Sequence, residues 1–228
     1  MNTKPKILLI YTGGTIGMIK DFETGALKAF NFDQLLERIP ELYLLDCTID
    51  TYSFEKPIDS SDMNPTHWIT LAEVIESNYN GFDGFVVLHG SDTMSYTASA
   101  LSFMLKNLNK PVILTGSQLP IGDLRTDAKE NLITAVQIAS LQQNGSPQIK
   151  EVGLYFEYKL YRGNRTTKIS AEHFNAFTSP NLPHLAESGV HLKVNDHLLE
   201  TFYTSHQLEV IKQLDSNVMV LKIFPGIT

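Results

Sequence analysis

Apolar and polar positions alternate in blocks along the first three quarters of the chain. Short, continuously apolar runs occupy residues 7–10, 85–88, 112–114 and 152–156. A strand that is apolar at consecutive positions is typical of a sheet covered on both faces. These runs therefore predict strands at the centre of the fold.

Segments with apolar residues at helical spacing lie between the runs. Asn64 and Pro65 supply a cap and a first-turn proline for one helix, and further helical periods cover residues 94–108 and 128–139. Strands that alternate with amphipathic helices indicate βαβ units. We therefore predict an α/β fold, a mostly parallel sheet with helices on both faces, from residue 5 to about residue 178.

The pattern changes towards the C-terminus. Residues 205–216 are polar, and the apolar run Val218–Phe224 then reads as another buried strand. Such a strand needs neighbours on both sides. We expect a domain over residues 1–195, a linker over 196–216 and the start of a second domain over 217–228, most of it missing. On that expectation the 228-residue polypeptide alone is inactive or nearly so.

Composition narrows the class of protein. The chain has 228 residues, with 18 Lys and Arg against 25 Asp and Glu, and its 43% apolar content is ordinary for a globular protein. A net charge of −7 argues against a nucleic-acid partner. No apolar stretch has the length of a membrane span or a signal peptide. Cys47 is the one cysteine, so we expect no disulfide and a cytoplasmic setting.

Hydroxyl-rich turns follow three of the predicted strands. They are Thr12–Gly17, His89–Met94 and Thr115–Gln118. Ligands of parallel sheets bind beyond the carboxyl ends of the strands, where these turns would meet. Each turn alone is also typical of an ordinary strand-to-helix connection with a Ser or Thr cap. The three together favour a site.

Other site chemistries fit poorly. The first turn resembles a dinucleotide fingerprint, but threonine replaces the first glycine and no acidic residue follows at the expected distance. No Gly-Lys-Ser/Thr sequence marks a P-loop. None of the seven histidines has a partner at metal-ligand spacing, and His89 at a strand end suits a buried core histidine. We expect neither a metal nor a cofactor.

Two further segments carry charge. Asp59, Ser60 and Ser61 precede the helix that starts at Asn64, where they suit either helix capping or a grip on the ends of a small polar ligand. Residues 161–168 read as a solvated cationic loop. A lysine from it, brought beside Ser91 and Asp92, would serve as a base for a hydroxyl. The residues alone do not decide between these interpretations.

Residues 12–16 and 89–94 together resemble the two signature motifs of the bacterial-type L-asparaginases. Residues 59–63, 96–105 and 161–168 are similar to the cytosolic, type I branch in particular. The resemblance runs to about Asn195. It implies a threonine-nucleophile amidohydrolase that converts L-asparagine to L-aspartate and ammonia through an acyl-enzyme. It also implies a second, smaller α/β domain and a homo-oligomer when the protein is full length.

The resemblance implies a role for each matching residue. Thr15 matches the nucleophile, while Ser91, Asp92 and Lys168 match the activating group; Ser91 replaces the family's usual threonine. Substrate-binding positions are Asp59, Ser60, Ser61, Ser91 and Asp92. The loop after the first motif, residues 20–27, lacks the tyrosine that often orients the nucleophile. Tyr11 is not assigned that role.

Two alternatives remain open at this point. Archaeal tRNA-dependent amidotransferases use a related subunit that liberates ammonia from glutamine for a partner, but with an additional N-terminal domain. A truncated, inactive chain that retains only the fold is the other alternative. Ammonia release by the purified protein would exclude the inactive chain, and a requirement for charged tRNA would identify the amidotransferase.

Overall fold

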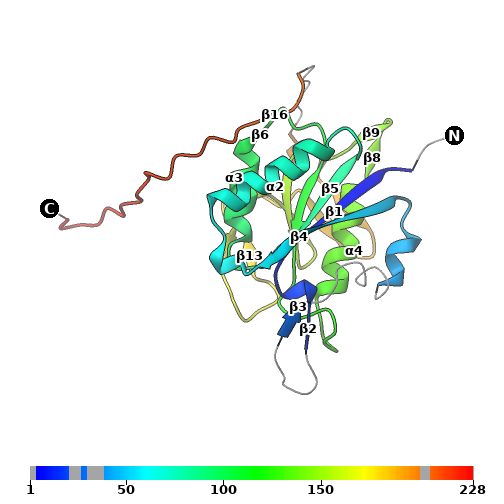
Figure 1. Cartoon of the computed structure of the whole chain (residues 1–228), viewed down its shortest axis with the longest axis horizontal. Coiled ribbons are helices and arrows are strands. Elements are labelled where there is room, and N and C mark those ends of the chain that lie inside the picture. Colours follow the sequence, from blue (N-terminus) through cyan, green and yellow to red (C-terminus); the bar gives the residue numbers. More distant parts are fainter. Residues whose placement is uncertain (1–3, 21–26, 30–38, 201–205, 228) are drawn as a thin grey trace.

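A computed structural model of the chain describes residues 4–20, 27–29, 39–200 and 206–227. An eight-stranded sheet forms its centre, in the order β15-β14-β11-β10-β7-β5-β1-β4 (Figure 1). The strands in this order are Leu192–Val194, Ala186–Ser188, Lys159–Arg162, Val152–Phe156, Val112–Thr115, Gly84–Leu88, Lys6–Gly13 and Thr48–Ile58.

The sheet is parallel over the five strands from β10 to β4 and antiparallel over β11, β14 and β15. Strands β1, β5, β7 and β10 coincide with the apolar runs of the sequence, and every residue of β5, β7 and β10 is buried. The predicted fold class is therefore confirmed. The antiparallel strands carry the sheet beyond residue 178, where the prediction ended it.

Helices cover both faces of the sheet (Figure 1). Leu71 and Ile75 of α2 (Pro65–Asn78) and Leu101 of α3 (Met94–Met104) pack with one set of strand side chains. Leu132 and Val136 of α4 (Ala128–Ala139) pack with the alternate set. Since successive strand residues point to opposite faces, continuously apolar strands are what two helical layers require.

Shorter elements complete the description. They are strands β2 (Met18–Lys20), β3 (Leu27–Ala29), β6 (Leu105–Lys106), β8 (Gln142–Gln143), β9 (Ser146–Pro147), β12 (Thr167–Lys168), β13 (Phe177–Thr178) and β16 (Glu209–Val210), and 3₁₀ turns η1 (Thr15–Gly17), η2 (Pro40–Leu44), η3 (Ser60–Asp62), η4 (Gly163–Arg165) and η5 (Asp196–Leu198). None of the helices among the described residues has the length and apolar character needed to cross a membrane.

The helix predicted over residues 94–108 ends early. It stops at Met104, because Leu105 and Lys106 pair as β6 with β16 in an antiparallel ladder. Asn107 then adopts a left-handed conformation with φ 58°, which a helix cannot continue through. The apolar spacing that extended the predicted helix to Leu108 is thus outweighed by the pairing of β6 with β16.

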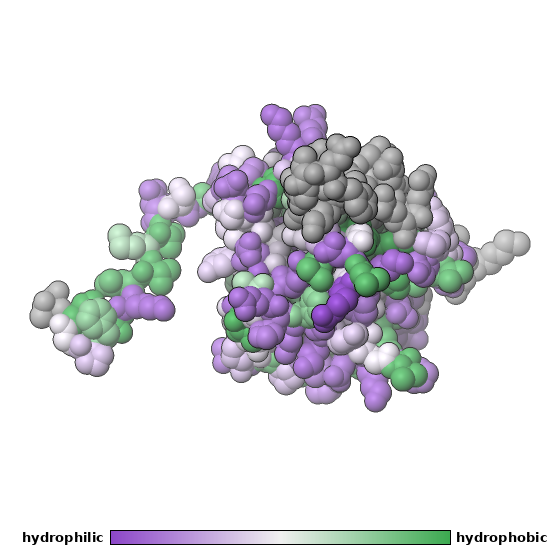
Figure 2. Space-filling view, turned by 90° about the horizontal axis from the view of Figure 1, so that it is seen from below, coloured by the Kyte–Doolittle hydropathy of each residue, from purple (hydrophilic) through white to green (hydrophobic). Residues whose placement is uncertain are grey.

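The C-terminal segment does not form the strand expected over residues 218–224. It is irregular and extends away from the body of the molecule (Figure 1). Its apolar side chains are exposed, from 59% at Phe224 to 88% at Met219, and Figure 2 shows this segment lying apart from the rest of the molecule. No strand among the described residues pairs with this segment, so the burial that the prediction assumed is absent. The proposed domain boundaries stay a prediction.

Candidate functional site

The turns after β1 and β5 are in direct backbone contact. Gly14 has φ 89°, and a Cβ atom there would lie 2.5 Å from the backbone nitrogen of Gly90. A Cβ atom on Gly90 would lie 2.4 Å from the Ser60 hydroxyl oxygen. Glycine is therefore required at both positions to bring three turns together at the carboxyl edge of the sheet.

Lys168 joins two side chains of the turn after β5. Its Nζ donates to Ser91 Oγ at 2.9 Å and to Asp92 Oδ1 at 2.6 Å. The pairing of β12 with β13 holds the backbone of Lys168, and its side chain is only 14% exposed. Residues that lie 76 and 77 positions apart in the sequence thus form one charged group.

Gln118, from the turn after β7, fixes the direction of the Ser91 hydroxyl. Ser91 Oγ donates to Gln118 Oε1 at 3.0 Å, and Gln118 Nε2 donates to the His173 carbonyl at 3.0 Å. Carbonyl oxygens only accept, so the single Ser91 proton points towards Gln118. The Ser91 lone pairs are therefore available to Lys168. The sequence singled out the turn of Gln118 but gave this side chain no role.

The turn that contains Asp59, Ser60 and Ser61 forms the rim of the group. Asp59 Oδ1 accepts from the Ser61 backbone N–H and the Ser61 hydroxyl, each at 2.9 Å. These two donors lower the pKa of the Asp59 carboxyl. Ser60 is buried, whereas Asp59 and Ser61 are exposed. Asp59 thus caps the short turn η3, whereas Asn64 caps α2, and the Ser61 hydroxyl stays at the surface.

Thr15 opens the short turn η1 directly after Gly14 and is partly exposed. The contact between Gly14 and Gly90 places it next to the turn of Ser91. Within the described part of the chain, no hydrogen bond joins the Thr15 side chain to Lys168, Ser91 or Asp92. Most of the loop that lacks the tyrosine, residues 21–26, lies outside the described residues.

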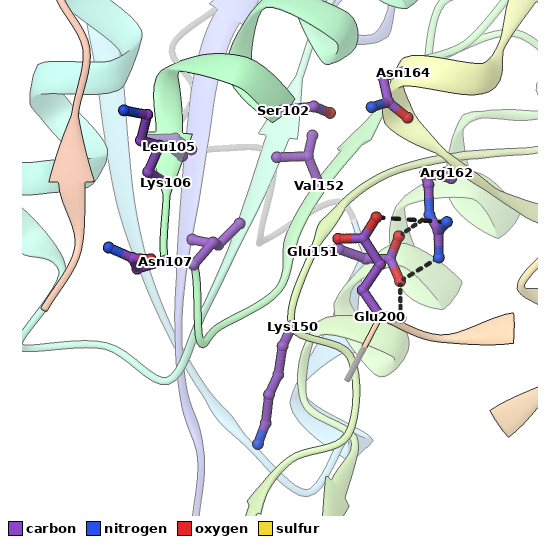
Figure 3. A pocket seen from close by; sticks show the side chains of 11 residues that line it. Ser102, Leu105, Lys106, Asn107, Lys150, Glu151, Val152, Arg162, Asn164 and Glu200 are labelled. Atoms are coloured by element: carbon purple, nitrogen blue, oxygen red, sulfur yellow. Dashed lines mark hydrogen bonds and ion pairs between the residues drawn. The ribbon is translucent and has the colours of Figure 1, made fainter. Parts of the chain in front are cut away.

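Of the hollows lined by described residues, two lie at opposite ends of the strands. An open one of about 340 Å³ is lined by Asp92, Tyr96 and Lys168 among others, but not by Thr15 or Ser60. The other, about 320 Å³, is at the amino ends of β7 and β10, where Arg162 pairs with Glu151 and Glu200 (Figure 3). Arg162, Glu151 and Glu200 form ion pairs with one another there, and the hollow lies away from the turns at the carboxyl ends of the strands.

His89 is fully buried under the turn and is hydrogen-bonded through both ring nitrogens. Nδ1 lies 2.7 Å from the Gly90 carbonyl, so it carries the proton, and Nε2 accepts from the Thr97 hydroxyl at 2.9 Å. Thr97 in turn accepts from the Trp68 indole at 2.9 Å. Burial lowers the pKa of His89 to about 4. His89 is thus a neutral core histidine, as the sequence favoured.

This burial predicts a pH dependence of stability. Between pH 6.5 and pH 4 the unfolded chain binds a proton at His89 that the folded protein does not, so the free energy of unfolding should fall with decreasing pH. The contribution is about 1.4 kcal/mol per pH unit and about 3 kcal/mol in total. Urea unfolding of the wild type and His89→Gln across this range measures the difference in slope. His191→Gln, at an exposed position, is the control, and equal slopes for wild type and His89→Gln would contradict the prediction.

The described residues hold no group of three or more His, Cys, Asp or Glu side chains placed to bind a metal. The turns after β1 and β5 instead bring the Thr15 and Ser91 hydroxyls and the Asp92 carboxylate to the same end of the sheet. Lys168 of β12 reaches Ser91 and Asp92 there. Nucleophilic catalysis by a hydroxyl needs a base next to it, so this group of side chains is a candidate for that chemistry.

Comparisons with known proteins identify the family of the chain. The model of the family "Asparaginase, N-terminal" matches residues 6–200. The chain is 45% identical to L-asparaginase 1 of Escherichia coli K12, over 99% of this chain and 65% of that protein. It is 40% identical to the 60 kDa lysophospholipase of Mus musculus, over 100% of this chain and 43% of that protein.

A solved structure gives the same result. L-asparaginase I of Vibrio cholerae superposes with a TM-score of 0.88 at 40% identity, covering 99% of this chain and 66% of that one. The chain therefore spans about two thirds or less of the length of these relatives. With a family model matched over most of its length, the chain belongs to the asparaginase family.

Proposed function

We propose that the complete protein hydrolyses L-asparagine to L-aspartate and ammonia. The observation that carries this proposal is the position of Lys168, whose Nζ donates to both Ser91 Oγ and Asp92 Oδ1 beside the turn of Thr15. The names of the relatives in E. coli and V. cholerae support the same reaction.

Thr15 is the proposed nucleophile. Its Oγ forms a bond to the side-chain carbonyl carbon of asparagine, and the carbon–nitrogen bond breaks to release ammonia. The proton of Thr15 passes to Ser91 as the proton of Ser91 passes to a neutral Lys168, and it is returned to the leaving nitrogen. Water then cleaves the Thr15 ester by the reverse sequence of proton transfers and releases aspartate.

The resting hydrogen bonds define what must change for this relay. Lys168 donates to Ser91, and Ser91 donates to Gln118. For Lys168 to accept a proton, it must lose one, and the Ser91 hydroxyl must turn from Gln118 towards Nζ. Rotation about the Cβ–Oγ bond of Ser91 is sufficient to turn the hydroxyl, because Gln118 Oε1 and Lys168 Nζ are both already at hydrogen-bond distance from Ser91 Oγ.

The backbone of the first turn is suited to the developing negative charge. Gly13 and Gly14 both adopt positive φ angles at the end of β1, and their backbone is fixed by packing against Ile58 and Gly90. Donors fixed before the reaction stabilise an oxyanion most effectively. We assign the α-carboxylate and α-amino groups of the substrate to Ser60, Ser61 and Asp59, with Asp92 at the amino end.

No step in this scheme needs a cofactor. We expect the complete protein to carry a second α/β domain and to act as a cytoplasmic homo-oligomer. The exposed Tyr96 and Phe103 on α3 and Ile169 beside Lys168, each at least 60% exposed, support a surface that is covered in the complete protein.

The test measures ammonia and aspartate from L-asparagine. The 228-residue chain and a form extended by a second domain are assayed side by side, with glutamine and a lysophospholipid as competing substrates. Stoichiometric ammonia and aspartate from the longer form support the proposal. Ammonia only in the presence of charged tRNA, or hydrolysis of the lysophospholipid alone, would overturn it.

A further inference from the structure

Thr93 occupies the N-cap of α3 but does not cap the helix. Threonine at this position ordinarily accepts a hydrogen bond from a backbone N–H of the first turn, yet here the side chain accepts none. Asn64, at the N-cap of α2, does accept from the Thr66 N–H at 3.0 Å. The hydroxyl of Thr93 is thus used for another contact.

That contact is with the turn proposed to bind substrate. Thr93 Oγ1 donates to the Ser60 carbonyl at 2.6 Å, across 33 positions of sequence. The same carbonyl accepts the Met63 N–H at 3.2 Å, which closes η3. Thr93 therefore ties the carbonyl at the start of η3 to the end of the turn that holds Ser91 and Asp92.

The packing around Ser60 leaves the hydrogen bond from Thr93 as the contact that keeps the two turns together. Ser60 is 4% exposed and its side chain already lies against Gly90, so it cannot move towards the β5 turn. It can only move away, and the Thr93 hydroxyl opposes that movement. No other side-chain hydrogen bond among the described residues links residues 59–63 to the turn of Ser91.

We propose that Thr93 is a positioning residue, which fixes the Asp59–Asp62 turn relative to Asp92 and thereby sets the affinity for the charged ends of the amino-acid substrate. This inference rests on the proposed function, since it takes Ser60 and Ser61 as substrate-binding residues. Among the described residues no hydrogen bond joins the Thr93 side chain to Lys168, and Thr93 has no part in the proposed proton transfer.

The role predicts a separation of kinetic constants. Contacts to the α-amino and α-carboxylate groups are alike in the ground state and the transition state, so weakening them raises KM and leaves kcat nearly constant. In the complete protein, Thr93→Val should raise KM for asparagine about 10-fold, with kcat within about 3-fold of wild type. Thr93→Ser keeps the hydroxyl and should restore a KM near that of the wild type.

Thr70→Val is the matched control. It removes the same hydroxyl from a bond to the Thr66 carbonyl within α2, a bond that does not join the two turns. We expect its KM to equal the wild-type value. A Thr93→Val variant with unchanged KM, or with a raised KM that Thr93→Ser does not restore, would overturn the proposal.

A second measurement does not depend on the substrate. Millisecond hydrogen exchange reports the Asp62 and Met63 amides, which bond to the Asp59 and Ser60 carbonyls. These amides should exchange at least about 5-fold faster in Thr93→Val than in wild type or Thr93→Ser. Equal exchange rates would overturn the positioning role. Absence of ammonia release by the wild type would instead overturn the proposed function, while the exchange rates still decide on Thr93.

Discussion

Thr15→Ala in the complete protein should abolish nearly all turnover of asparagine, lowering kcat by at least about 1,000-fold. Without the Thr15 hydroxyl the proposed ester at this residue cannot form, and the proton relay through Ser91 and Lys168 loses the group that it activates. Thr15 lies in a short turn and is partly exposed, so its truncation should leave the melting temperature within a few degrees of wild type. Steady-state ammonia release and thermal unfolding measure the two effects.

Two variants isolate the hydroxyl as the cause. Thr15→Ser keeps a primary hydroxyl and should retain measurable activity, whereas Thr70→Ala removes a hydroxyl from α2 and should be indistinguishable from wild type. Mass spectrometry after rapid quenching should detect an ester on the peptide of residue 15 in wild type, Thr15→Ser and Thr70→Ala, but not in Thr15→Ala. Retention of a large fraction of activity by Thr15→Ala would show that another residue is the nucleophile.

The centre of the fold was predictable because burial on both faces leaves a distinct pattern. Strands β1, β5, β7 and β10 are flanked by paired strands and covered by helices, so they are apolar at consecutive positions. Strand β4 was missed for the converse reason. It is an edge strand, exposed or half-buried over all 11 residues, and it lacks a continuous apolar run. Its position depends on pairing with β1, which the sequence alone does not reveal.

The site was predictable only as far as topology places turns at one edge. Parallel strands bring the turns of Thr15, Ser91 and Gln118 together, and the sequence showed this. The approach of Lys168 depends on the antiparallel excursion through β11 and β12, whose short strands have weak patterns. The contact of Thr93 was hidden, because a threonine before a helix is ordinarily explained as its cap.

Lys168→Met is the second substitution with a large expected effect. Methionine approximates the aliphatic stem of lysine but cannot take up a proton, so kcat should fall about 100- to 10,000-fold. The reason is geometric, since Lys168 Nζ is the titratable group 2.9 Å from Ser91 Oγ on the proposed path of the proton. KM should change much less than kcat, because the proposed contacts to the ends of the substrate are made by other residues.

The change should cost little stability, which separates it from a folding defect. Asp92, the carboxylate that loses its partner, has a side chain that is 61% exposed and remains hydrated when unpaired. Lys106→Met is the control, because it removes an ion pair with Glu209 at the surface, away from the site. If Lys168→Met kept more than about a tenth of the wild-type kcat, Lys168 would act as a binding or structural cation and not as the base. In that case the Ser91 hydroxyl would keep its hydrogen bond to Gln118 throughout the reaction, because it would not need to give up its proton.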